Sequence, residues 1–174
     1  MSYITSRAQM EYQLRRTSRK IENDEALGIL RRCTWGFLSI VGPNATPYGV
    51  PLNYALLEQD GEKHLIFHCA PEGRKLDYLK LQPQAAFVAV EGAETLPDKF
   101  STAYASAMVS GSIEIVDEPE AKRSLLKFIV HILAPDFQER GDKHIEHRLS
   151  DCCVLKLKIE HICGKGRKKE EPYA

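Results

Sequence analysis

The sequence predicts a mainly β protein, an antiparallel barrel or sandwich that carries three or four peripheral helices. About six apolar, β-prone runs are separated by short turn-forming segments, which is typical of antiparallel strands joined by hairpins. Asp60-Gly61, between two such runs, is a strong hairpin signal. Neither GxGxxG nor GxxxxGK(S/T) occurs. A wound parallel sheet with one of the common phosphate-binding loops is therefore not expected.

Composition narrows the class of protein. The chain has 174 residues, which fits one domain with a substantial core. Its 24 basic residues balance its 24 acidic ones, so neither nucleic acid nor an anionic membrane is expected as a partner. No apolar run approaches the ~20 residues of a membrane-spanning helix, and no apolar signal-peptide centre is present near residue 1. We expect a cytoplasmic protein, because the odd set of five cysteines does not form a disulfide framework.

The first part of the chain is expected to supply an arm, a helix and a strand. Residues 1–20 are polar and basic and form the arm. Asn23 or Asp24 can cap a helix with an apolar stripe. The run WGFLSIV, residues 35–41, predicts the first strand and places Trp35 in the core.

A hairpin and a short helix come next. Strands at 48–57 and 64–69 flank the Asp60-Gly61 turn. Pro71 is expected at the first position of a helix over 72–81, because proline is tolerated there. The two strands and the helix form the centre of the predicted fold.

The first turn of that helix carries two cations, Arg74 and Lys75. Backbone N–H groups at a helix start and neighbouring cationic side chains together suit an anion. The same two residues also fit the solvated face of a helix, and the pattern alone does not decide between these interpretations.

The second half is expected to alternate strands and helices. A strand at 85–91 is followed by a loop that begins at Gly92 and by a long strand at 104–116. Gly111 inside that strand indicates a bulge or bend. The remaining expected elements are a helix capped by Asp117 and running to residue 133, a helix at 142–150, a strand at 153–162 and a charged tail at 168–174.

Several phrases occur in a characteristic order: WGFLSIV, PYGVPLNY, LIFHCAPEGRKLDYL, LPDKFSTAYASAMVSGSIEIV and IEHICGKGRK. Together they resemble the nitroimidazole-resistance group of the pyridoxamine 5′-phosphate oxidase-like, FMN-binding split-barrel superfamily, over residues 24–167. The resemblance implies a six-stranded antiparallel split β-barrel over residues 21–167. It also implies a homodimer with FMN at the subunit interface.

The resemblance also implies a set of cofactor-binding residues. The phosphate would be held by Arg74 and Lys75, beside His68, Cys69 and Ala70 at the end of the preceding strand. The ring edge would meet the segment Val50, Pro51, Leu52 and Asn53, and the hydroxyl groups of Tyr104 and Ser106 would reach across the dimer interface.

The chemistry of FMN and of the residue types can be compared with these expected roles. FMN presents a dianionic phosphate, which suits fixed cations and amide donors. Because Pro51 cannot donate to a strand ladder, the strand is expected to depart from regular pairing there. Each residue also has a purely structural interpretation. His68 could be a hydrogen-bonded core histidine, Asn53 could cap a bulge, and Cys69 could be an inert thiol. Tyr104 and Ser106 could be ordinary strand residues.

The expected function is electron transfer from reduced nicotinamide, through FMN, to a small acceptor such as a nitroaromatic compound. His68 is the candidate for a direct part in that chemistry. A second possibility is a non-catalytic flavin- or haem-binding protein on the same barrel, with His68, His131 or His161 as axial ligand. A third is a dimeric interaction module without a cofactor. A metal site is not expected, because the chain has no CxxC pair.

Overall fold

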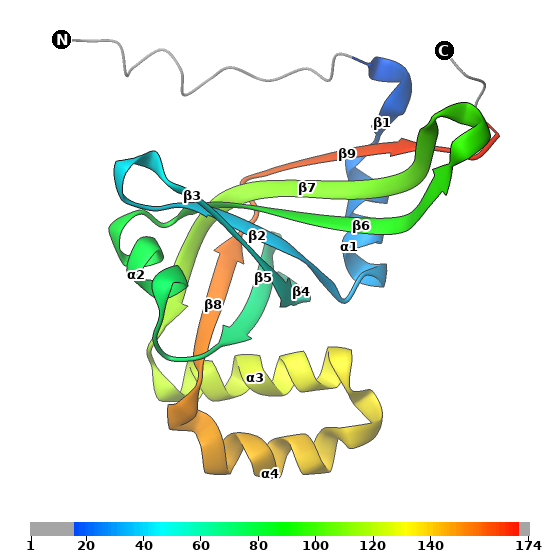
Figure 1. The fold of residues 1–174 in the computed structure, drawn as a ribbon. Coiled ribbons are helices and arrows are strands. Elements are labelled where there is room, and N and C mark those ends of the chain that lie inside the picture. The colour runs from blue at the N-terminus through cyan, green and yellow to red at the C-terminus, as the bar shows by residue number, and fades with distance from the viewer. Residues whose placement is uncertain (1–15, 171–174) are drawn as a thin grey trace.

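The computed structural model describes residues 16–170, a mainly β fold with four α-helices around it (Figure 1). Residues 1–15 of the expected arm and 171–174 of the expected tail lie outside this range. The helices are α1 (Asn23–Arg32), α2 (Arg74–Leu81), α3 (Pro119–Leu133) and α4 (Gln138–Arg148). The strands are β1 (Lys20–Ile21), β2 (Trp35–Val41), β3 (Pro47–Asn53), β4 (Ala55–Gln59), β5 (Glu62–Cys69), β6 (Gln84–Leu96), β7 (Ser101–Val116), β8 (Cys153–Lys158) and β9 (His161–Arg167). Short 3-10 turns are η1 (Thr17–Arg19), η2 (Pro43–Ala45), η3 (Pro97–Lys99), η4 (Pro135–Phe137) and η5 (Leu149–Asp151).

The sheet is antiparallel and open, as the split-barrel prediction requires. Its main path runs β3-β2-β6-β7-β8-β5-β4, and β9 pairs with both β7 and β1. β3 and β4 are consecutive in the chain but stand at opposite ends of this path. The described residues form nine strands rather than six, because two predicted strands each divide in two and β1 adds a short pair.

Tyr54 divides the strand that the sequence predicts at 48–57. β3 before it pairs with β2, whereas β4 after it pairs with β5 around the predicted turn. The tyrosine is almost fully buried, and its hydroxyl donates to the Leu30 carbonyl at 2.8 Å. Its ring packs against Phe87 and Phe67 at centroid distances of 4.8 and 6.4 Å. This aromatic group forms the centre of the barrel core.

Gly111 marks the bend that was predicted for the long strand. Before it, β7 pairs with β9 as far as Ser110; after it, β7 pairs with β8 from Ile113 onward. A Cβ at residue 111 would lie 1.8 Å from the carbonyl oxygen of Lys158, the last residue of β8. Only glycine permits this approach of two backbones.

The expectation that a loop begins at Gly92 is wrong. β6 continues to Leu96 and pairs with β7 through a long hairpin, whose register shifts between Glu91 and Glu94. Gly92 adopts φ 61° within the shift. A bulge thus replaces the loop, because one residue with positive φ lets the strand bend and resume its pairing.

The helices begin close to, but not at, the predicted residues. Glu118, not Asp117, caps α3: its carboxylate accepts from the N–H groups of Glu120 and Ala121 at 2.9 and 2.6 Å. Helices α3 and α4 form a hairpin at one end of the molecule, below β5 and β8 in Figure 1. Their apolar side chains make a second core with Ile66 and Val154.

One face of the sheet is apolar and uncovered within residues 16–170. Pro51, Phe37, Val88, Met108 and Cys163 lie opposite one another in register, forming a row across β3, β2, β6, β7 and β9. Phe37 remains 48% exposed. We call this row and its apolar neighbours the outer face.

Trp35 belongs to the outer face, so the expectation that it lies in the core is wrong. It is 53% exposed and contacts Phe37 edge-on at 5.7 Å between ring centroids. Residues two apart on a strand point to the same side, which puts both rings outside the barrel.

Candidate functional site

The junction between β5 and α2 brings the predicted cations to a helix start. Arg74 and Lys75 are the first two residues of α2, and Gly73 before them adopts φ 120°. The expectation that this helix begins at residue 72 is wrong, because the backbone of Gly73 is not helical. The Gly73 carbonyl accepts from the N–H groups of Leu76 and Asp77. Arg74 is exposed and Lys75 is half-buried.

Tyr48 connects this helix start with β3. The Arg74 guanidinium lies over the Tyr48 ring, 5.6 Å from its centroid. Tyr48 also meets Tyr78 of α2 edge-on, with ring centroids 6.0 Å apart. A hollow of about 460 Å³ lies beside Tyr48, where β2, β3 and β6 border the end of α2. The contact with Tyr48 places Arg74 beside β3, two residues before the predicted ring-edge segment, whereas the hollow borders the other end of α2 and contains none of the predicted site residues.

β3 holds the four predicted ring-edge residues on alternating faces. Val50 and Leu52 pack against the barrel core, whereas Pro51 and Asn53 are exposed. The expected departure from regular pairing at Pro51 is wrong, since the register with β2 is unbroken. β3 ends the strand order, and an edge strand leaves alternate N–H and C=O groups unpaired without any irregularity.

Asn53 has a local role in the structure. Its side-chain amide donates to the Thr34 carbonyl at 3.0 Å. The Tyr54 N–H donates to the same carbonyl, at 3.3 Å. Both bonds fasten the end of β3 to the start of β2, and the Asn53 side-chain oxygen remains as an acceptor.

His68 and Cys69 end β5 on opposite faces. Cys69 is half-buried against the barrel core, and Ala70 after it is exposed. His68 lies opposite Val154 on the side of the helical hairpin. The imidazole has solvent on one side, but the protein around it removes enough water to lower its pKa below the ordinary 6.5. A neutral His68 is therefore favoured near pH 7.

Tyr104 and Ser106 lie elsewhere in the sheet, in the part of β7 that pairs with β9. Ser106 is buried, and its hydroxyl donates to the Lys165 carbonyl at 2.8 Å. Tyr104 is half-buried opposite Arg167, which is itself buried and donates to the Ser101 hydroxyl. Three strand spacings, about 14 Å, separate β7 from β3. The predicted site thus falls into two separate groups within one chain.

A buried histidine that the sequence did not single out lies on β5. His64 is 7% exposed, and its Nδ1 has no hydrogen-bond partner among the described residues. Burial and the nearby Lys156 ammonium lower the pKa of His64 below its ordinary value. The sequence gave no clear sign of this burial, because His64 stands between the charged Lys63 and the apolar Leu65.

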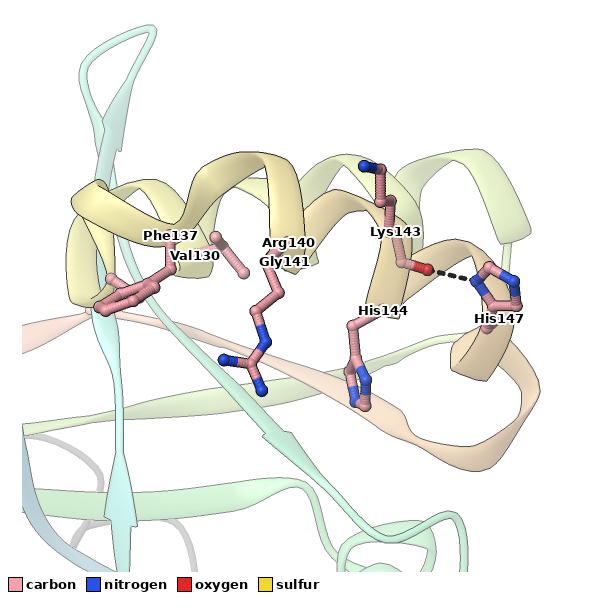
Figure 2. Close-up of a pocket in the computed structure, with 8 residues that line it drawn as sticks. Val130, Phe137, Arg140, Gly141, Lys143, His144 and His147 are labelled. Carbon is pink, nitrogen blue, oxygen red and sulfur yellow. Dashed lines mark hydrogen bonds between the residues drawn. The ribbon is translucent and has the colours of Figure 1, made fainter.

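A second hollow, of about 610 Å³, lies on the helical hairpin and contains none of the predicted site residues. Val130 and Phe137 are among the residues that line it. Figure 2 shows Arg140 and His144 extending to the same side of α4, while Lys143 points away. The His147 ring contacts the Lys143 carbonyl at 2.6 Å.

The described part of the chain offers no metal centre: no three His, Cys, Asp or Glu side chains in residues 16–170 are grouped to hold an ion. All five cysteines are free thiols. Within the same residues, each helix is too short or too polar to cross a membrane.

Comparison with known proteins gives a family and a fold. A family model described as pyridoxamine 5′-phosphate oxidase matches residues 22–166. A proposed 5-nitroimidazole antibiotic resistance protein of Bacteroides thetaiotaomicron is 22% identical, with a TM-score of 0.66 over 84% of this chain and 85% of that one. A flavocytochrome of Azotobacter vinelandii is 19% identical, with a TM-score of 0.72 over 94% of this chain and 75% of that one.

A further similar structure is the FAD and haem binding protein of Mycobacterium smegmatis. It is 18% identical, with a TM-score of 0.72 over 90% of this chain and 76% of that one. At these identities the solved structures establish the split-barrel fold alone. The search of curated proteins gave no significant match.

Proposed function

Because this chain belongs to the pyridoxamine 5′-phosphate oxidase family, we propose that it is a cytoplasmic flavoprotein that binds FMN. It passes electrons from reduced nicotinamide to a small acceptor, a nitroaromatic compound being the model substrate. The observation that carries this proposal is the contact between Arg74 and Tyr48, which joins a cationic helix start to an edge strand.

The residues at this junction fit the cofactor's chemistry. Lys75 and the first-turn N–H groups of α2 supply donors and positive charge for a dianionic phosphate. The contact with the Tyr48 ring favours one position for the Arg74 charge. The unpaired backbone groups of β3 suit the hydrogen-bonding edge of the flavin ring. These features match a phosphate at one end and a flat, polar-edged ring at the other.

The protein's own part is to bind, orient and exclude water. Bound flavin supplies the hydride and electron chemistry. The edge strand would hold the ring through backbone hydrogen bonds, which do not depend on protonation. His68, neutral near pH 7, lies six residues before Arg74 in the chain and is the candidate to exchange a proton with the acceptor.

The position of the second group of predicted residues supports a role for a second copy of the chain. Tyr104 lies about three strand spacings from β3, too far for both to meet one ring within a chain. We infer a homodimer through the outer face, where Trp35, Phe37 and Met108 form an apolar surface. Such a dimer would place β7 of one subunit near β3 of its partner. Ser106 then acts structurally, since its hydroxyl proton is already used.

A second candidate function is favoured by two of the similar structures, described as a flavocytochrome and as a FAD and haem binding protein. A non-catalytic flavin- or haem-binding role would use the same barrel. His68, His131 and His161 are all exposed and could serve as axial ligands. Ligation would need an apolar pocket around one of them, which the hollow at Tyr48 does not provide.

The visible spectrum of the purified protein tests the proposal, measured before and after incubation with excess FMN and desalting. Retained flavin absorbance, followed by oxidation of reduced nicotinamide that depends on a nitroaromatic acceptor, is the expected result. A haem band would favour the second candidate. A protein that stays colourless after FMN treatment would refute flavin binding, and bound flavin without turnover would refute the oxidoreductase.

A further inference from the structure

Two cysteines face each other across the β5–β8 pair. Cys69 and Cys153 are directly opposite in register. Opposed residues of an antiparallel pair project from the same face, and both side chains here join the barrel core. The Cys153 thiol lies within hydrogen-bonding reach of Cys69. Cys69 is also among the residues expected beside the FMN phosphate, whereas Cys153 has no expected part in that site.

The geometry of such a pair suits a disulfide. Directly opposed residues in antiparallel strands have Cα atoms roughly 4.5–5.5 Å apart. Disulfides span Cα separations of roughly 4.4–6.8 Å. The bond therefore requires side-chain rotation and no separation of β5 from β8. The third nearby cysteine differs: Cys152 points to the opposite face, among the apolar residues of the helical hairpin.

We propose that Cys69 and Cys153 are an oxidation site, at which hydrogen peroxide produces a reversible cross-strand disulfide. The Cys69 sulfur attacks peroxide, the O–O bond breaks, and Cys69 sulfenic acid and one water are formed. The Cys153 sulfur then attacks the Cys69 sulfur, the S–O bond breaks, and a second water leaves. Two thiols are thus oxidised by two electrons while one peroxide is reduced to two waters.

The order of these steps follows from exposure. Cys69 is half-buried at the end of its strand, whereas Cys153 is 8% exposed. Burial is the main cause that raises the pKa of Cys153 to about 11. Cys153 is therefore protonated near pH 7 and is poorly suited to meet the oxidant first. It is well placed to capture a sulfenic acid that forms beside it.

Peptide mapping tests the site on the full-length protein without added flavin, so the result does not depend on the proposed function. The reduced protein is treated with hydrogen peroxide, alkylated and digested with trypsin without reduction. We expect peptide 64–74, which contains Cys69, to be joined to peptide 149–156. Cys152 and Cys153 share the second peptide, so variants must identify the partner.

Three variants decide the assignment. Cys152→Ser should retain the cross-link, whereas Cys69→Ser and Cys153→Ala should each lose it. Dithiothreitol should restore the free thiols, and the oxidised parent should show a higher Tm than Cys153→Ala treated in the same way. In Cys153→Ala, dimedone should trap the Cys69 sulfenic acid.

Other products would overturn the proposal. A cross-link that disappears in Cys152→Ser would show that Cys69 is joined to Cys152 and not to Cys153. Sulfinic acid at Cys69 without any cross-link would show that Cys153 does not capture the intermediate. Unmodified Cys69 at peroxide levels that oxidise the exposed Cys163 would show that the pair is inert.

Discussion

Replacing Lys75 by Ala tests the phosphate site at the level of one charge. A dianionic phosphate about 4 Å from an ammonium gains roughly 2 kcal/mol at the dielectric constant of water, and lower values of that constant increase it. Because Lys75 is only half-buried at the helix start, we use the value for water with little change. A loss of about 2 kcal/mol corresponds to about 30-fold weaker binding. This agrees with the roughly 1.5–3 kcal/mol of a charge-assisted hydrogen bond.

Riboflavin, which lacks the phosphate, makes the test specific. Dissociation constants would be measured by quenching of flavin fluorescence, for FMN and riboflavin, with the parent and with Lys75→Ala. We expect the 30-fold loss for FMN and less than a twofold change for riboflavin. Lys80→Ala is the matched control, since Lys80 is exposed in the last turn of the same helix. It should change neither constant.

Two outcomes would refute the reasoning. If Lys75→Ala binds FMN as tightly as the parent, Lys75 belongs to the solvated face of α2. If it loses FMN and riboflavin equally, the side chain acts on the ring or on the fold, and the phosphate lies elsewhere. Circular dichroism of each variant would separate loss of the helix from loss of the contact.

Four further predictions concern stability and assembly. In a denaturant titration, Gly111→Ala should lower the free energy of unfolding by about 4 kcal/mol or more, because the added Cβ collides with a backbone oxygen. Gly49→Ala is the control and should be nearly neutral, because the atom nearest to its Cβ is 3.9 Å away. Tyr54→Phe should lose about 1–3 kcal/mol in chemical denaturation, since a buried carbonyl of α1 loses its donor, and an unchanged midpoint would contradict the hydrogen bond. The pKa of His64 is lower in the folded state than in the unfolded state, so the unfolded chain binds more protons, and the free energy of unfolding should fall as the pH drops below about 6.5. His64→Gln should flatten this pH dependence. If the parent and the variant give parallel curves, other groups cause the dependence. Phe37→Glu should leave a folded monomer in sedimentation equilibrium, and a persistent dimer would exclude the outer face as the interface.

Local signals in the sequence predicted local features well. Asp60 and Gly61 adopt φ 53° and 79°, the positive values that a tight hairpin turn demands. Gly111 indicated a bend because no other residue type allows two backbones to meet so closely. The mainly β class and the place of Arg74 and Lys75 at a helix start followed in the same way.

Features that depend on distant partners were not predictable from local patterns. Tyr54 interrupts a continuous β-prone run because its hydroxyl bonds to a helix far along the chain. The run WGFLSIV is apolar on both faces, so periodicity cannot distinguish a strand buried on both sides from one with an uncovered outer face. The separation of Tyr104 from β3 arises from strand order, which spacing along the chain does not encode.

The partner exchange of β7 has a consequence for synthesis of the chain. β7 is complete by residue 116, yet its pairs with β8 and β9 require residues up to 167. At about 5–20 residues per second, one edge of a long apolar strand is left open for several seconds while α3 and α4 are made. Open strand edges recruit other chains. A nascent or prematurely ended chain that lacks β9 should therefore be a substrate for chaperones, and stop codons before residue 161 should yield aggregates rather than a smaller barrel.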